Sequence, residues 1–249
     1  MGEPIVAVEN LVTSYGYERV LDGVSFEVMP GEIFFILGES GCGKSTLLKH
    51  IIGLHQPESG RVRVCGVEIN ATRESDLSRV RTRVGILFQG GALLDSLTVG
   101  ENVALPLLRH MEAPPNLVAQ IVRMKLAMVN LAGYENHMPA EISGGMQNRV
   151  GLARAFALDP TVIFLDEPTS GLDPINAQEI DELLAKVNRS LGTTMLIVSQ
   201  DLRSVFSIGH RVMLLDGQRR GIAAIGTPGE LRADPPTELA ARFFRRSQG

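Results

Sequence analysis

Tryptophan is absent from this chain, and aromatic residues make up only 5% of it, although 44% of its residues are hydrophobic. The apolar content is therefore mostly aliphatic. Together with a charged fraction of 21%, it predicts a folded core and excludes a largely disordered chain. The length of 249 residues is enough for one large α/β domain or for a domain with one insertion.

Long hydrophobic runs, a basic excess and cysteine pairs are missing too. The longest strongly apolar segment, Ile33 to Leu37, is far shorter than the roughly 18–20 residues of a membrane span. The formal net charge of -4 gives no electrostatic support for nucleic-acid binding. Cys42 and Cys65 do not form a metal-binding pair, and the first residues show no secretory signal, so we expect the chain in a reducing cytosol.

Short strand-like runs alternate with helical ones along the chain, which predicts an α/β fold. Alternating or continuous apolar residues predict strands at Ile5–Val12, Val24–Val28, Ile33–Leu37, Arg61–Ile69, Val84–Phe88, Val162–Leu165, Met195–Val198 and Val212–Leu215. Helical spacing predicts helices at Lys44–Ile52, Leu117–Leu131 and Met146–Leu158. Because residues 90–158 are mostly helical in pattern, we expect a helical section to interrupt the α/β core.

The segment from Gly38 to Ser45 reads Gly-Glu-Ser-Gly-Cys-Gly-Lys-Ser and matches the phosphate-binding loop pattern in full, between an expected strand and an expected helix. Its glycines let backbone N–H groups turn toward phosphate oxygens, and the helix adds its positive N-terminal end. Lys44 can reach the β- and γ-phosphates, and Ser45 can offer its hydroxyl to Mg²⁺. The residues expected to contact the nucleotide here are Gly38, Glu39, Ser40, Gly41, Cys42, Gly43, Lys44, Ser45 and Thr46.

An apolar strand that begins at Val162 ends in two carboxylates, Asp166 and Glu167. Beside a phosphate-binding loop, an aspartate in this place normally holds the water shell of Mg²⁺. Glu167 is then placed to orient or deprotonate the water that attacks the nucleotide. On its own, such a pair would more simply be solvated at the end of a strand, but the phosphate-binding loop favours a catalytic role.

The segment Ile142-Ser143-Gly144-Gly145-Met146-Gln147 resembles the signature sequence of ABC ATPases, which is usually Leu-Ser-Gly-Gly-Gln. A Ser-Gly-Gly turn that opens a helix offers N–H groups and a hydroxyl to an anion. The resemblance extends from about Ile5 to Leu231. It implies a P-loop NTPase core with an antiparallel β subdomain (residues 1–89 and 159–231), an inserted α-helical subdomain (residues 90–158) and a C-terminal tail (residues 232–249).

The same resemblance implies roles for three further residues. Tyr15 matches the aromatic residue that stacks on adenine, with Tyr17 as a less suitable substitute, although packing at the surface would also explain Tyr15. Gln89 matches the loop glutamine that touches Mg²⁺ or water and relays to the membrane subunit, although it could be a solvated loop amide. Asp173, in Ser170-Gly171-Leu172-Asp173, matches the carboxylate that communicates across a dimer.

The resemblance also implies ATP and Mg²⁺ as ligands and an ATP-driven dimer. Two copies are expected to enclose two ATP molecules, with the phosphate-binding loop of one copy facing Ser143, Gly144 and Gly145 of the other. The helical section is expected to dock a coupling helix of an integral membrane permease.

One residue departs from the family pattern. After the strand Met195–Val198 the family has a histidine that contacts the γ-phosphate, whereas this chain has Gln200. Glutamine can donate a neutral hydrogen bond but cannot carry positive charge. We therefore hypothesise that Lys44, Glu167 and Gln200 form the catalytic set and that hydrolysis is slow, by a factor of up to about 10²–10³.

Several segments resemble the Mla/Mce-type lipid-transport ATPases of bacteria: Phe88–Val99, Glu101–Leu107, Met138–Glu141 and Met146. This implies transport of phospholipids or other hydrophobic molecules from the cytoplasmic face of the inner membrane, with a permease and a periplasmic Mce-domain protein. An importer subunit for amino acids or metals shares the core motifs, and a hydrolysis-impaired ATP-dependent clamp would follow from Gln200. A soluble ABC ATPase acting on DNA or ribosomes would need a coiled coil, a second ATPase domain or a basic patch, none of which the sequence has.

Overall fold

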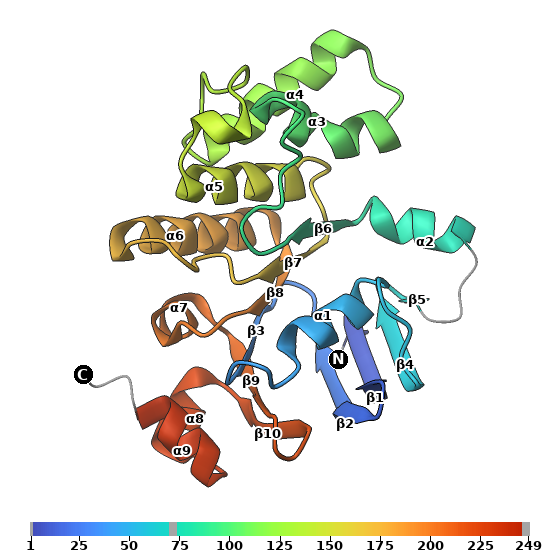
Figure 1. The fold of residues 1–249 in the computed structure, drawn as a ribbon, viewed down its shortest axis with the longest axis vertical. Coiled ribbons are helices and arrows are strands. Elements are labelled where there is room, and N and C mark those ends of the chain that lie inside the picture. The colour runs from blue at the N-terminus through green and yellow to red at the C-terminus, as the bar shows by residue number, and fades with distance from the viewer. Residues whose placement is uncertain (1, 70–73, 246–249) are drawn as a thin grey trace.

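The structure is a computed structural model that describes residues 2–69 and 74–245. Three parts are visible in Figure 1: a central sheet, a smaller sheet beside it, and a layer of helices on the far side of the central sheet. Helix α1 (Lys44–Ile51) packs between the two sheets, against β4 on one side and β3, β7 and β8 on the other. The phosphate-binding loop therefore lies where the two sheets meet.

The central sheet has six strands in the order β10-β9-β3-β8-β7-β6. All neighbouring strands are parallel except β10, which pairs antiparallel with β9. The strands are β3 (Ile33–Gly38), β6 (Val84–Leu87), β7 (Val162–Asp166), β8 (Thr194–Val198), β9 (Arg211–Asp216) and β10 (Gly221–Gly226). Because β3, β7 and β8 end at the same edge, the phosphate-binding loop, the acidic pair and Gln200 are brought together there.

The central strands are apolar at every position because both faces of the sheet are covered. In β3, Phe35 and Leu37 pack into the core on the helical side, whereas Phe34 and Ile36 pack into the core around α1 and the smaller sheet. This alternation explains why Ile33 to Leu37 is continuously apolar rather than amphipathic.

The smaller sheet is antiparallel in the order β2-β1-β4-β5. Its strands are β1 (Val6–Tyr15), β2 (Glu18–Val28), β4 (Ser59–Val64) and β5 (Val67–Glu68). One strand predicted from Arg61 to Ile69 is in fact two strands that form a hairpin, because Cys65 and Gly66 both have positive φ and reverse the chain. The antiparallel β part expected from the family resemblance is therefore present.

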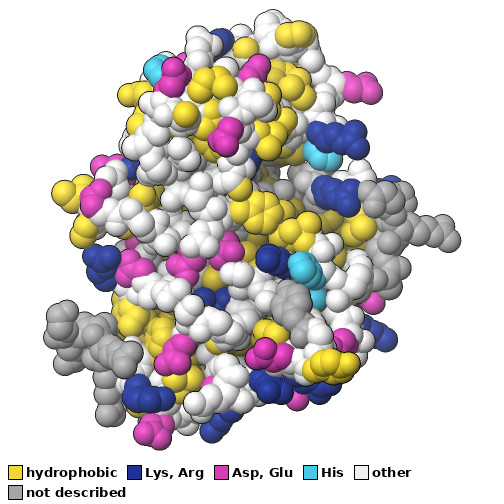
Figure 2. Space-filling view, viewed as in Figure 1, with side chains coloured by type: hydrophobic (Ala, Val, Ile, Leu, Met, Phe, Trp, Pro, Cys, Tyr) yellow, Lys and Arg dark blue, Asp and Glu magenta, His cyan; other side chains and the backbone are white. Residues whose placement is uncertain are grey.

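The helical layer consists of α3 (Val99–His110), α4 (Pro115–Met128), the 3₁₀ turn η1 (Pro139–Glu141) and α5 (Gly144–Ala155). Helix α3 begins at a capping box, in which Thr98 and Glu101 accept each other's backbone N–H groups. Figure 2 shows hydrophobic side chains on the surface of this layer. A hollow of about 460 Å³ between α3 and α4 is lined mainly by apolar side chains, including Ala104, Leu108, Val118 and Val122.

Five helices have no counterpart in the sequence prediction: α2 (Glu74–Arg81), α6 (Pro174–Leu191), α7 (Leu202–Ile208), α8 (Pro228–Ala233) and α9 (Glu238–Arg245). Near the C-terminus, Phe244 is buried and its ring meets that of Phe206 edge to face, so α9 packs against α7 of the same chain. Within the described residues, no helix combines the length and the apolar character that crossing a membrane would require.

Candidate nucleotide-binding site

The loop that joins β3 to α1 turns as a phosphate-binding loop must. Gly41 and Gly43 have φ of 81° and 101°, which side-chain-bearing residues rarely adopt. A Cβ atom at Gly43 would also lie 2.9 Å from Leu21 Cδ2. Helix α1 begins at Lys44, as the helical spacing predicts, with Gly43 as its N-cap.

Lys44 is buried, and its Nζ donates hydrogen bonds to the carbonyl oxygens of Gly38 at 2.9 Å and Glu39 at 3.0 Å. The ammonium group is therefore held against the loop that surrounds the phosphate position. Beside it lies a cavity of about 290 Å³, which we call the nucleotide cavity. It is lined by Ser40, Gly41, Gly43, Lys44, Ser45, Thr46, Gln89, Glu167 and Gln200.

Two residues of the loop lie on its other side. Glu39 and Cys42 line a separate cavity of about 280 Å³, together with Leu239 and Arg242 of α9. Neither residue lines the nucleotide cavity, so a nucleotide contact by Glu39 or Cys42 stays a prediction. Gly38 contributes its carbonyl oxygen to Lys44, and any side chain there would overlap Cys42 Sγ.

Ser45 and Asp166 meet across the two elements that carry them. Ser45 Oγ at the start of α1 donates a hydrogen bond of 3.4 Å to Asp166 Oδ1 at the end of β7. Burial raises the pKa of Asp166, while the Ser45 hydrogen bond and the nearby Lys44 act in the opposite direction. Hydroxyl and carboxylate oxygens are the ligands that Mg²⁺ prefers, and it takes its remaining ligands from water and substrate phosphates. The pair therefore fits Mg²⁺, although the described residues contain no cluster of three or more metal-binding side chains.

Glu167 sits on a sharp turn after β7, with φ of 51°. Its N–H donates to the carbonyl oxygen of Val198, and its Oε1 accepts a hydrogen bond of 3.1 Å from Gln200 Nε2. Burial raises the pKa of the Glu167 carboxyl, and the Gln200 hydrogen bond opposes that rise. The side-chain amide of Gln200 thus donates a hydrogen bond to the Glu167 carboxylate at the edge of the nucleotide cavity.

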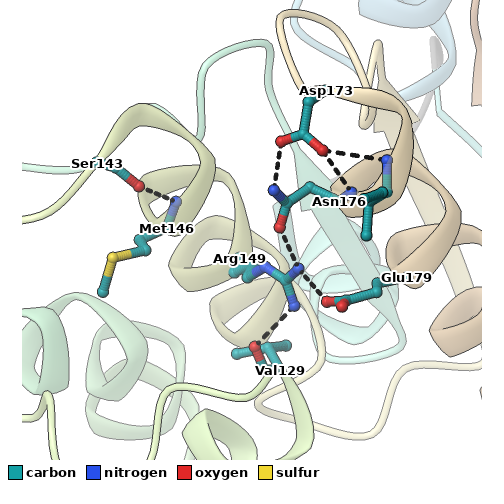
Figure 3. Close-up of polar contacts among 8 residues, drawn as sticks. Val129, Ser143, Met146, Arg149, Asp173, Asn176 and Glu179 are labelled. Carbon is teal, nitrogen blue, oxygen red and sulfur yellow. Dashed lines mark hydrogen bonds and ion pairs between the residues drawn. The ribbon is translucent and has the colours of Figure 1, made fainter.

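The signature turn, Ser143-Gly144-Gly145, lies elsewhere. Ser143 caps α5, because its Oγ accepts a hydrogen bond of 3.2 Å from the N–H of Met146 (Figure 3). None of the three residues lines the nucleotide cavity of its own chain. Ser143 and Gly144 are exposed, so this anion-binding turn is open to another molecule.

Asp173 is also exposed and also lies outside the nucleotide cavity. It caps α6, where its Oδ1 accepts hydrogen bonds of 3.1 Å from the N–H groups of Ile175 and Asn176. The pKa of Asp173 is lowered, chiefly by a hydrogen bond from the Asn176 side chain and then by the Asn176 backbone N–H. The carboxylate is therefore held in its charged form.

The two aromatic candidates are less well defined. The backbone of Tyr15 ends β1 and pairs with Glu18 of β2, but its side chain lies outside the described part of the chain, so adenine stacking stays a prediction. Tyr17, the substitute, is fully exposed in the turn between these strands.

Sequence reasoning missed two arginines of α5 that organise the site loops. Arg154 donates to the carbonyl oxygens of Gly91 at 2.7 Å and Ala92 at 2.9 Å, which anchors the loop after Gln89 to the helix. Arg149 is buried and reaches toward α6. The sequence held one signal for these two residues: each is an arginine on the apolar face of a predicted helix. A buried arginine needs hydrogen-bond partners from other parts of the fold.

A phosphate-binding loop between a buried parallel strand and a helix, with an acidic strand end beside it, defines a P-loop NTPase. Comparison with known proteins narrows this class. The family model described as ABC transporter matches residues 21–170. The chain is 41% identical to the intermembrane phospholipid transport system ATP-binding protein MlaF of Haemophilus influenzae, over 93% of this chain and 87% of that protein.

Two further comparisons agree with this result. The chain is 43% identical to the methionine import ATP-binding protein MetN 1 of Rhodopseudomonas palustris, over 92% of this chain but only 61% of that protein. The dimeric post-hydrolysis structure of the ATP-binding cassette MJ0796 bound to ADP and Pi has a TM-score of 0.83 and 32% identity, covering 89% of this chain and 98% of that one. The chain belongs to the ABC transporter family. It is an ATP-binding, ATP-hydrolysing subunit of the kind found in these transporters. The predicted fold class is thereby confirmed.

Proposed function

We propose that this chain hydrolyses ATP to drive a bacterial transporter of phospholipids or other hydrophobic molecules. The similarity to MlaF over 93% of the chain supports this substrate class. In this proposal the protein works as a homodimer on the cytoplasmic face of the inner membrane. It is bound to an integral membrane permease, and a periplasmic Mce-domain protein carries the lipid.

The chemical step is assigned to residues at the edge of the central sheet. Loop N–H groups and Lys44 bind the β- and γ-phosphates of ATP, the substrate. Glu167 orients the attacking water and takes its proton as the bond between the β- and γ-phosphates breaks, giving ADP and phosphate. Ser45, Asp166 and Gln89 would hold Mg²⁺, which supplies charge stabilisation at the phosphate oxygens. Gln200 keeps the Glu167 carboxylate oriented through its 3.1 Å hydrogen bond.

The observation that best supports a dimer is that the signature turn lies outside the nucleotide cavity of its own chain. Ser143, Gly144 and Gly145 form an anion-binding turn that does not line the cavity of its own chain. A second copy, related by twofold symmetry, can bring its turn to this cavity while receiving the reciprocal contact. The cassette MJ0796, to which the chain is similar, is a dimer bound to ADP and Pi, which supports a dimer of this chain.

The helical layer is the part that we assign to the permease. Its surface carries exposed hydrophobic side chains, and the hollow between α3 and α4 is mainly apolar (Figure 2). Such a surface suits an amphipathic helix of a membrane partner better than a nucleic acid. The loop after Gln89 is anchored to α5 of this layer, which links the contact to the nucleotide cavity.

Two alternatives differ in cargo or in turnover. The 43% identity to a MetN protein favours an amino-acid importer as the second candidate. A clamp that binds ATP but barely hydrolyses it would follow if Gln200 cannot support the reaction.

The test is purification of the chain with its membrane partners, followed by ATPase measurement beside Glu167→Gln. Copurification of a permease and an Mce-domain protein, with partner-stimulated turnover that Glu167→Gln abolishes, is the expected result. Copurification with a substrate-binding protein for amino acids would support the importer. ATP binding without turnover, even with the permease present, would support the clamp.

A further inference from the structure

A buried arginine connects the signature helix to the loop that carries Asp173. Arg149 lies on α5, and only 7% of it is exposed. Its Nη2 donates to Asn176 Oδ1 at 3.0 Å and to Glu179 Oε2 at 2.7 Å, and its Nη1 donates to the carbonyl oxygen of Val129 at 3.4 Å (Figure 3). One guanidinium group thus joins α5, α6 and the end of α4.

The arginine fixes the orientation of the Asn176 amide. Arginine has only donors, so it is the oxygen of Asn176 that must face it, and the NH₂ group then points the other way. There the NH₂ donates to Asp173 Oδ2, and the ionised carboxylate has acceptors only (Figure 3). The direction of donation is therefore the same along the whole chain of hydrogen bonds: Arg149 donates to Asn176, and Asn176 donates to Asp173.

The signature turn and the Asp173 loop also touch directly. A Cβ atom added at Gly145 would lie 3.1 Å from Leu172 Cδ2, so the glycine permits a close approach of the turn to the residue before Asp173. The two exposed loops are therefore connected twice, by this contact and by the Arg149–Asn176 relay. Both lie outside the nucleotide cavity of their own chain.

We propose that Arg149 and Asn176 are positioning residues that hold Asp173 and the signature turn as one surface for a second copy of the chain. This inference rests on the ATP-bound homodimer proposed above. Asp173 is exposed, so without the relay its carboxylate would depend on the helix cap alone. Because Val129 lies at the end of α4, the relay also ties this surface to the helical layer, and a shift of that layer moves both loops together.

Asn176→Asp is the sharpest variant. The new side chain has the same size and still accepts a hydrogen bond from Arg149, but it places a second carboxylate against Asp173. We expect unchanged ATP affinity, a roughly tenfold lower kcat per nucleotide-binding chain, and weaker ATP-driven dimerisation when combined with Glu167→Gln. The matched control is Glu179→Gln, which removes the ion pair with Arg149 and leaves the amide relay, and it should keep kcat and dimerisation near those of the unaltered chain.

The outcomes separate this inference from the proposed function. If Glu167→Gln alone does not dimerise with ATP, the homodimer itself is wrong. If it does, and Asn176→Asp dimerises and turns over as well as the control, the relay has no positioning role. A purely structural role would lower the melting temperature of Asn176→Asp while leaving kcat per nucleotide-binding chain unchanged, which also overturns the inference. Asn176→Ala, which removes both contacts, is measured in the same way if Asn176→Asp does not fold.

Discussion

Residue 200 of this chain is a glutamine with a neutral amide, whereas the ABC ATPase pattern has a histidine at this position. The structure has the amide donate to Glu167 Oε1 at 3.1 Å, so one role of the histidine, orienting the carboxylate, is retained. A second role, a positive charge near the γ-phosphate, is unavailable to glutamine.

Gln200→His should therefore raise kcat, by up to about 10²–10³-fold if charge at this position matters as much as one transition-state donor does. The measurement is steady-state ATPase activity, with Gln200→Ala as the control that removes both the donor and the charge. Equal turnover in the glutamine and histidine proteins would contradict the argument, since it would mean that the amide replaces the histidine fully.

The dependence of kcat on pH is a second test of the Gln200→His substitution. Burial raises the pKa of Glu167 above its ordinary value of 4.5, and only the ionised carboxylate can take a proton from water. In the unaltered chain kcat should fall as the pH drops through this raised pKa. Gln200→His should add a further change near about pH 6.5, where an imidazole titrates.

Helices α6 and α7 enclose a buried carboxyl group, that of Asp181, whose pKa is raised. Asp173 is the N-cap of α6, and Asp201, the residue after Gln200, is the N-cap of α7; the two helices pack together. Asp181 of α6 is 7% exposed, and burial together with the neighbouring Asp201 carboxylate raises its pKa to about 6, against the opposing effects of the Ser204 side chain and of Arg203. A carboxyl group in this environment is more stable protonated.

Asp181→Asn should stabilise the folded chain above pH 6. An acid whose pKa is raised on folding costs stability once it is ionised, so the cost is absent below about pH 4, grows as the pH rises, and is complete above pH 6. A shift from 3.8 to about 6 corresponds to roughly 1–3 kcal/mol. Denaturant unfolding at pH 4, 6 and 8 measures this, and a variant equally more stable at all three values would show that its effect is not electrostatic.

The elements differ in how well the sequence predicts them. Strand β3 and helix α1 follow directly from a continuous apolar run and a phosphate-binding loop. Helix α6 was missed, although it carries local signals: Asp173 as its cap, proline in its first turn and Gly192 in the left-handed conformation after its end. The relay from Arg149 to Asn176 was beyond prediction, because it joins residues 27 positions apart on two elements whose packing no local pattern specifies.

In the whole molecule, the signature turn and Asp173 lie outside the nucleotide cavity of their own chain. Lys44, Ser45 and Glu167 gather around the nucleotide cavity at the edge of the central sheet, whereas Ser143 and Asp173 lie on exposed loops outside it. The motifs identified the individual parts, but their spacing in sequence could not reveal this separation. If each site is shared, a defect in one loop and a defect in the other should complement each other between copies.

Mixing two inactive variants tests this directly. Lys44→Ala disables the phosphate-binding loop and Ser143→Arg blocks the signature turn, so neither homodimer should hydrolyse ATP. In a mixed dimer one site receives both defects, while the other combines an intact loop with an intact turn. After equal mixing, half of the dimers are mixed, and activity should return to about a quarter of the unaltered level if the two sites act independently. Sites completed within one chain would give no recovery at any ratio. If both sites must hydrolyse ATP together, activity would also not recover. In that case the two variants, each also carrying Glu167→Gln, would still form mixed dimers with ATP.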